Sequence, residues 1–105
     1  MNASFPKRIR AGLPLDDTDR AILARMGDTH TLSGIAGHAA AYTGRSLAVL
    51  RGPRRDAPIV RVRQRIAYIA RALGYSYPRI GMTINRHHTT VMDLVRNEQR
   101  RRTQA

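Results

Sequence analysis

Residues 76–91 read SYPRIGMTINRHHTTV and decide the fold that the chain is expected to adopt. Ser76 is a residue type that caps helix N-termini, and Pro78 suits the first helical turn because its missing N–H has no helical partner there. A short helix is therefore expected over residues 77–83. Asn85-Arg86 then predicts a tight turn.

A longer helix is expected after this turn, from about His87 to Arg101. The order of short capped helix, tight turn and longer helix predicts a helix-turn-helix over residues 76–96. In that motif the second helix lies in the major groove of DNA, and its first residues meet base edges. Four polar residues that can donate or accept hydrogen bonds stand there: His87, His88, Thr89 and Thr90. Their chemistry predicts base reading, in which a threonine methyl can also pack on a thymine methyl.

Further helices are expected upstream, where apolar residues recur at helical spacing. They cover residues 16–27, residues 30–43, a short segment that begins near Ser46, and residues 59–73. Asp16 or Asp17 is expected to cap the first of them, and Thr29 or Thr31 the second. Glycines are expected to end these helices at Gly27, Gly44, Gly52 and Gly74. No segment shows strand-like alternation, so the sequence predicts an all-α domain of five to six helices.

The chain is expected to divide into three parts. Residues 1–14 lack a helical period and predict a flexible basic arm, residues 15–28 an accessory short helix, and residues 29–102 the DNA-binding domain. Five aromatic residues in 105 require a mainly aliphatic core. Its apolar faces are expected to include Tyr42, with Arg63 mostly off them. Residues 100–102 are interpreted as a solvated helix end or as phosphate-binding arginines.

Charge is the strongest signal of composition. The net charge is +12, and it is uneven: residues 1–52 carry +3 and residues 53–105 carry +9. Eighteen of the nineteen basic residues are arginine, whose planar donor fork binds phosphates and guanine edges bidentately. A basic half of this kind favours a polyanionic partner, most often nucleic acid, although a solvated arginine-rich surface is the alternative.

Several classes of protein are disfavoured. Without cysteine the chain has no disulfide and no cysteine-ligated metal. The adjacent His87 and His88 lack companions for a metal shell, so no metal or cofactor is expected. No nucleophile with a positioned base is recognisable, so no enzymatic activity is expected. No apolar run approaches the roughly 20 residues that span a bilayer, and no apolar signal core follows Lys7. The expected compartment is the bacterial cytoplasm or nucleoid.

Three motifs carry a family resemblance: NRHHTTV at residues 85–91, SYPRIG at residues 76–81, and Arg63-Gln64 before the aliphatic residues 66–73. Together they resemble the C-terminal DNA-binding domain of the bacterial replication initiator DnaA, a helix-turn-helix of the Trp-repressor-like superfamily. The family's recognition helix begins approximately Gly-Arg-Asp-His-Thr-Thr-Val, and its upstream motif is Ser-x-Pro-x-Ile-Gly. The resemblance covers about residues 30–101 and extends back to about Ile35 without a gap. The turn at Asn85, which stands in for a glycine pair, and the loop after Leu73 are each one residue shorter than in the family.

The resemblance implies roles for the matched positions. Arg55, with Arg54 beside it, matches an arginine that enters an A·T-rich minor groove, where negative potential is concentrated. His88 and Thr89 match the pair that touches bases in the major groove. Positions near the phosphates are matched by Thr90, Arg63, Gln64 and Pro78, and Arg86 matches the arginine just before the recognition helix. Arg61, Arg79 and Arg86 are also expected at phosphates.

Two departures from the family pattern matter. The family's aspartate, which helps to read a cytosine, is His87 here, so an acceptor has become a group that can donate. The recognised DNA sequence is therefore expected to differ from the family's usual one. No Gly-x-x-x-x-Gly-Lys-Ser/Thr motif occurs in the chain, so neither nucleotide binding nor ATP hydrolysis is expected.

These observations predict a sequence-specific double-stranded DNA-binding protein of bacterial or phage source. It is interpreted as a small transcriptional regulator or a replication-associated factor without an ATPase domain. A homodimer is also considered, with residues 16–27 as the candidate contact, because one small module buries little DNA surface. Two rivals stay open: a sequence-independent RNA-binding or nucleic-acid-packaging module, and a protein-interaction module. The recognised sequence, the regulated gene and the sign of regulation are not encoded in these patterns.

Overall fold

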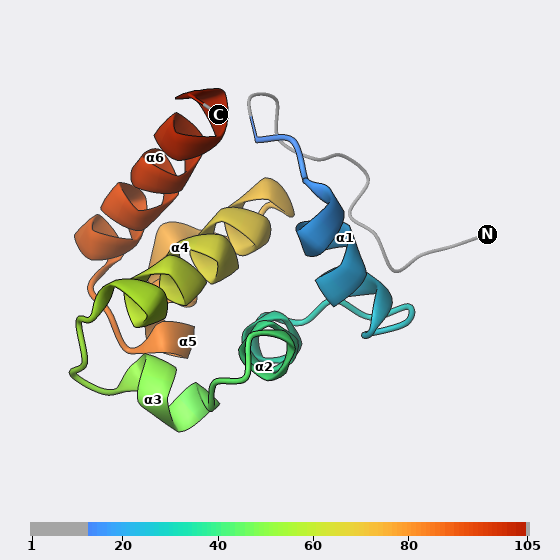
Figure 1. The fold of residues 1–105 in the computed structure, drawn as a ribbon, viewed down its shortest axis with the longest axis horizontal. Coiled ribbons are helices and arrows are strands. Elements are labelled where there is room, and N and C mark those ends of the chain that lie inside the picture. The colour runs from blue at the N-terminus through green and yellow to red at the C-terminus, as the bar shows by residue number, and fades with distance from the viewer. Residues whose placement is uncertain (1–12, 105) are drawn as a thin grey trace.

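The structure, a computed structural model, describes residues 13–104 and is all-α. Figure 1 shows α4 in the middle of the molecule, between α6 on one side and α1 and α2 on the other. No strand occurs among residues 13–104, which confirms the predicted fold class. The six helices that this range contains are α1 (Asp17–Ala24), α2 (Leu32–Tyr42), α3 (Leu47–Arg51), α4 (Ala57–Ala72), α5 (Tyr77–Ile84) and α6 (His88–Gln104).

Side-chain caps explain where the helices begin. Asp16 caps α1 in a reciprocal capping box: its Oδ1 accepts from the Asp19 N–H at 2.8 Å, and Asp19 Oδ2 accepts from the Asp16 N–H at 3.0 Å. Thr31, Ser46 and Ser76 cap α2, α3 and α5 through their hydroxyl oxygens. Each of these caps satisfies a backbone N–H that has no helical partner. The predicted cap at Ser76 is confirmed, and α3 begins directly after Ser46, as expected. Asp16 and Thr31 are the caps used where two residues were considered.

The core lies around α4, which packs most extensively against α6 and then against α2. Its buried face and its C-cap, Leu73, carry the aliphatic residues that the helical spacing predicts: Ile59, Val62, Ile66, Ile69, Ala70 and Leu73. Ile80 and Ile84 of α5 and Val91 of α6 are fully buried against the same core. The expected inward position of Tyr42 is wrong, because this residue stands in the last turn of α2, beyond the residues that pack on the core, and is 46% exposed.

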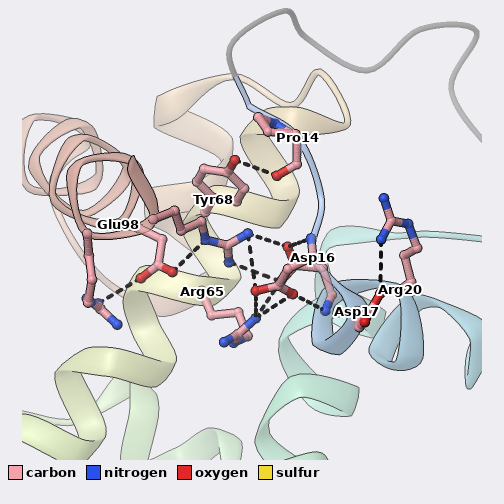
Figure 2. A network of polar contacts seen from close by, with 10 residues as sticks. Pro14, Asp16, Asp17, Arg20, Arg65, Tyr68 and Glu98 are labelled. Carbon is pink, nitrogen blue, oxygen red and sulfur yellow. Dashed lines mark hydrogen bonds and ion pairs between the residues drawn. The ribbon is translucent and has the colours of Figure 1, made fainter. Parts of the chain in front are cut away.

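Helix α1 is joined to the rest of the fold by a buried carboxylate. Asp19 is fully buried, and its two oxygens accept from Arg65 Nη1 of α4 at 2.7 Å and from Arg102 Nη1 of α6 at 2.6 Å. Glu98, also buried, accepts from Arg102 Nε at 2.7 Å. Figure 2 shows Asp16, at the cap of α1, converging with Arg65 of α4 and Glu98 of α6 on this cluster. We call these residues, Asp16, Asp19, Arg65, Glu98 and Arg102, the acidic anchor.

The anchor corrects the interpretation of the chain's last arginines. The Arg102 guanidinium lies 3.9 Å from the centroid of the Tyr68 ring, and Arg101 donates to Glu98 at 2.7 Å and to Gln64. Burial alone would lower the pKa of Arg102, but hydrogen bonds to Asp19 and Glu98 raise it above its usual value. Arg101 and Arg102 are therefore held within the fold, and only Arg100 is an exposed helix-end arginine.

The predicted arm over residues 1–14 lies almost wholly outside the described residues. Its last two residues are held, contrary to the prediction: Leu13 is buried, and the Pro14 carbonyl accepts from the Tyr68 hydroxyl at 2.6 Å. Leu15 is buried as well. Within residues 13–104, none of the helices combines the length and the apolar character that crossing a bilayer requires.

Acid is expected to weaken the anchor at Asp16. Burial opposes ionisation of this carboxyl, but the hydrogen bonds from Asp19 N–H and Arg65 and the charges of Arg65 and Arg102 lower its pKa below 3.8. A carboxyl whose folded pKa is depressed stabilises the fold above its unfolded pKa, and this contribution is lost as the pH falls through the folded value. We therefore expect the free energy of unfolding to decrease as the pH drops below about 3.8.

Urea unfolding between pH 6 and pH 2.5 measures this effect. Asp16→Asn is the matched control, because asparagine is as good a helix cap as aspartate but does not titrate. The variant is expected to lose less stability on acidification than the original chain. An equal loss in both proteins would contradict a role for Asp16.

Candidate nucleic-acid interface

The start of α6 presents the residues that were expected to read bases. His88, Thr89 and Thr90 form its first turn, His87 directly precedes it, and all four side chains are exposed. Val91, the next residue, is fully buried and packs this end of α6 onto the core. The polar residues are thus held at the surface by an apolar residue on the opposite face of the same turn.

The turn before α6 depends on Asn85. This residue has φ 58° and ψ 51°, the left-handed conformation that asparagine tolerates better than most non-glycine residues. It is the one non-glycine residue with positive φ in the described part of the chain. Its side chain donates to the Arg51 carbonyl at 3.1 Å. The turn is thereby tied to the end of α3, 34 residues earlier in the sequence.

The loop between α3 and α4 carries two neighbouring arginines, and only one of them is hydrogen-bonded within the described part of the chain. Arg54 donates to both oxygens of Asp56, from Nε and Nη2 at 3.0 Å each. The hydrogen bond from Arg54 lowers the pKa of the Asp56 carboxyl. Arg55 is exposed and has no hydrogen bond or ion pair with any residue in 13–104. Of the two arginines, Arg55 is therefore the one whose donor fork is available to a ligand.

Arg63 is a structural residue, contrary to the expectation that it lies near phosphates. It is 3% exposed, and its guanidinium donates to the carbonyls of Leu50 at 2.8 Å and Gly52 at 3.0 Å. These carbonyls stand at the C-terminal end of α3, where helical acceptors lack partners and the helix dipole favours a cation. Burial lowers the pKa of Arg63, and the nearby charge of Arg86 lowers it further.

Arg86 joins the same carbonyl from the other side. Its Nη2 donates to the Gly52 carbonyl at 2.5 Å, and its Nη1 donates to the Asn85 carbonyl at 2.8 Å. The Gly52 carbonyl oxygen thus accepts hydrogen bonds from one arginine of α4 and from one arginine in the turn before α6. We call Arg63, Arg86 and the Gly52 carbonyl the Gly52 clamp. It fixes the loop that carries Arg55 against the turn that leads into α6.

An open hollow of about 480 Å³ lies beside this clamp. Figure 1 shows the α3–α4 loop and the α5–α6 connection along the same edge of the molecule. The residues that line the hollow come from both segments, and three of them are arginines. They are Arg51, Gly52, Pro53, Arg55, Asn85 and Arg86. Arg51 was not singled out from the sequence. It donates to the Thr83 carbonyl at 2.7 Å and so ties α3 to the end of α5.

The other residues expected at phosphates differ in their availability. Arg61, Pro78 and Arg79 are exposed, and the Arg79 guanidinium lies 5.3 Å from the centroid of the Tyr75 ring. Gln64 accepts from Arg101, so its carbonyl oxygen is engaged within the fold. Tyr75 is also engaged, because its hydroxyl donates to the His30 carbonyl at 2.6 Å.

Carboxylates near this edge are paired with arginine. The chain has seven acidic residues, and three of them belong to the acidic anchor at the far end of α6. In the α3–α4 loop Asp56 is paired with Arg54, so the exposed Arg51 and Arg55 set the potential of the hollow. Within residues 13–104, no three side chains of the kinds that ligate metals gather at one point.

Comparison with known families gives one match. The model of the bacterial DnaA protein helix-turn-helix matches residues 33–97, which begins in α2 and ends in α6. No curated protein and no solved structure matches the chain significantly. The matched residues contain the α3–α4 loop, the Gly52 clamp and the start of α6.

Proposed function

Because the chain belongs to the family of the bacterial DnaA helix-turn-helix, a DNA-binding and non-catalytic domain, we propose that it binds double-stranded DNA at specific sequences. The observation that carries this proposal is the common edge shared by two exposed groups, Arg55 on the α3–α4 loop and residues 87–90 at the start of α6. A helix start of this kind suits a major groove, and a free arginine beside it suits the adjacent minor groove.

We assign DNA contacts to the side chains that are exposed and not held by other residues of the chain. Residues 87–90 read base edges, and Arg55, rather than the Asp56-bound Arg54, enters the minor groove. Arg61, Pro78 and Arg79 are exposed and contact phosphates. Arg63 takes no part in the contact, because its guanidinium is buried on carbonyls.

The biological role that fits these assignments is regulation of transcription or an accessory step in replication. No nucleotide-binding motif accompanies the domain in this chain. Pairing of two copies stays a prediction. Helix α1 is a poor candidate for the contact, because its apolar residues Ile22 and Leu23 are buried in the chain's own core.

Selection from a random duplex pool at physiological salt tests the proposal. We expect one motif with a neighbouring A·T-rich element. Thr89→Ala is expected to cost about 1–3 kcal/mol at one base position and little elsewhere, since a base contact acts on one base pair. Arg55→Ala is expected to remove the preference for the A·T-rich element.

Arg25→Ala is the matched control for lost charge, because Arg25 is exposed and is the C-cap of α1. Figure 1 shows α1 on the opposite side of α4 from α6. This variant should leave both affinity and motif unchanged. Binding without any preferred duplex sequence would support the RNA-binding or packaging alternative. The absence of nucleic-acid binding would support the protein-interaction alternative.

A further inference from the structure

His87 is the N-cap of α6. It stands one residue before the helix, and its backbone carbonyl accepts the first helical hydrogen bond, from the Val91 N–H at 3.1 Å. Its side chain accepts from the Thr89 N–H through Nδ1 at 3.2 Å. Histidine is an unusual cap, but the contact has the pattern of one, in which a side-chain acceptor satisfies a first-turn N–H.

This cap determines which ring nitrogen of His87 carries the proton. A backbone N–H can only donate, so the contact from the Thr89 N–H assigns Nδ1 as the unprotonated nitrogen that accepts. The neutral ring therefore has its hydrogen on Nε2. The Thr89 hydroxyl oxygen also lies 2.8 Å from Nδ1, where it can donate to the same lone pair. Both contacts hold the ring in one orientation.

The outward nitrogen of this ring is available. His87 is exposed, and Nε2 makes no hydrogen bond with any residue between 13 and 104. The His88 ring lies beside it, with ring centroids 4.3 Å apart and planes inclined by 34°. His87 therefore presents a single oriented N–H donor at the start of the helix that is proposed to read bases.

We infer that His87 is a specificity-determining residue that donates from Nε2 to an acceptor on a base edge and selects guanine at the position it meets. This inference rests on the proposed DNA binding. Guanine presents two acceptors, N7 and O6, in the major groove, adenine and thymine present one each, N7 and O4, and cytosine presents only an amino donor. A donor facing that amino group gains no hydrogen bond, and both groups lose their water. Cytosine is thus the base that His87 excludes at this position.

Two isosteric variants test the inference without removing the cap. In both His87→Asp and His87→Asn an oxygen can accept from the Thr89 N–H, because aspartate and asparagine are equally good caps. The second terminal atom then differs: aspartate offers an acceptor outward and asparagine a donor. Selection from a random duplex pool is expected to shift one position from guanine to cytosine or adenine in His87→Asp. The guanine preference is expected to persist, weaker because of the shorter reach, in His87→Asn.

A base analogue locates the contact on one atom. Replacement of the selected guanine by 7-deazaguanine removes the N7 acceptor, and we expect at least about fivefold weaker binding by the original chain. The same replacement should not weaken binding by His87→Asp. Nitrogen NMR of the free protein measures the tautomer independently and should show the hydrogen on Nε2.

Two kinds of failure can be told apart. If no motif emerges for the original chain, the proposed function is wrong and the inference falls with it. If a motif emerges but His87→Asp leaves every position unchanged, only the inference is overturned. A neutral ring with its hydrogen on Nδ1, or selection of cytosine at the position that His87 controls, would overturn it as well.

Discussion

Replacement of Asp19 by alanine is expected to destabilise the fold by about 3 kcal/mol, the lower end of the range for breaking a buried ion pair. Asp19 is fully buried and accepts hydrogen bonds from Arg65, from Arg102 and from the Asp16 N–H. Removal leaves two partly buried guanidiniums short of a partner and opens the capping box of α1. The value stays at the lower end because Asp16 and Glu98 retain contacts with these arginines.

Asp17→Ala is the matched control for this variant. Asp17 lies in the same helix and pairs with Arg20 at 3.3 Å, but both side chains are exposed. Exposed pairs of this kind contribute about 0–1 kcal/mol. Urea unfolding followed by circular dichroism measures both variants. Equal stabilities of Asp19→Ala and Asp17→Ala would show that the acidic anchor does not hold α1 to the fold.

Replacement of Gly81 by alanine is expected to destabilise the fold by about 2–3 kcal/mol and to weaken DNA binding. A Cβ at this position would collide with the backbone carbonyl oxygen of Arg86 and lie 3.5 Å from Val91 Cγ2. The Arg86 N–H donates to the Gly81 carbonyl at 2.8 Å, so the turn cannot retreat without losing a hydrogen bond. The clash outweighs the gain of about 1 kcal/mol that alanine offers inside a helix.

Gly37→Ala is the matched control, and it is expected to change stability in the opposite direction. Gly37 lies inside α2, and a Cβ there would meet no atom within 4 Å. Only the helix preference for alanine remains, so we expect stabilisation by about 0.5–1 kcal/mol. If the unfolding midpoints of both variants moved in the same direction, this would contradict the close approach of Gly81 to the turn before α6.

The helices could be predicted from the sequence because their signals are local. Ser46 and Ser76 stand where a cap is needed, and apolar residues recur at helical spacing through α4. The family motifs at residues 76–81 and 85–91 extended this to the helix-turn-helix, and the match over residues 33–97 confirms it.

Side-chain pairings between distant residues could not be predicted. Arg63 belongs to an arginine-rich segment, and no local pattern tells that its guanidinium is buried on carbonyls 11 to 14 residues earlier. The contact of Arg102 with Asp19 spans 83 residues. Arg54 and Arg55 are adjacent and identical in type, so only the position of Asp56 beside the Arg54 fork separates them. The orientation of the His87 ring likewise depends on where the helix starts.

The Gly52 clamp has a consequence for the length of a binding site. One additional base pair between a minor-groove element and a major-groove element moves them apart by about 3.4 Å and rotates them by roughly 35° around the duplex axis. A loop and a helix held to one carbonyl oxygen by Arg63 and Arg86 cannot follow that screw motion. Under the proposed binding mode, a DNA site can therefore change by single base-pair substitutions that each weaken binding in part. An insertion or deletion between its minor-groove and major-groove elements abolishes binding in a single step.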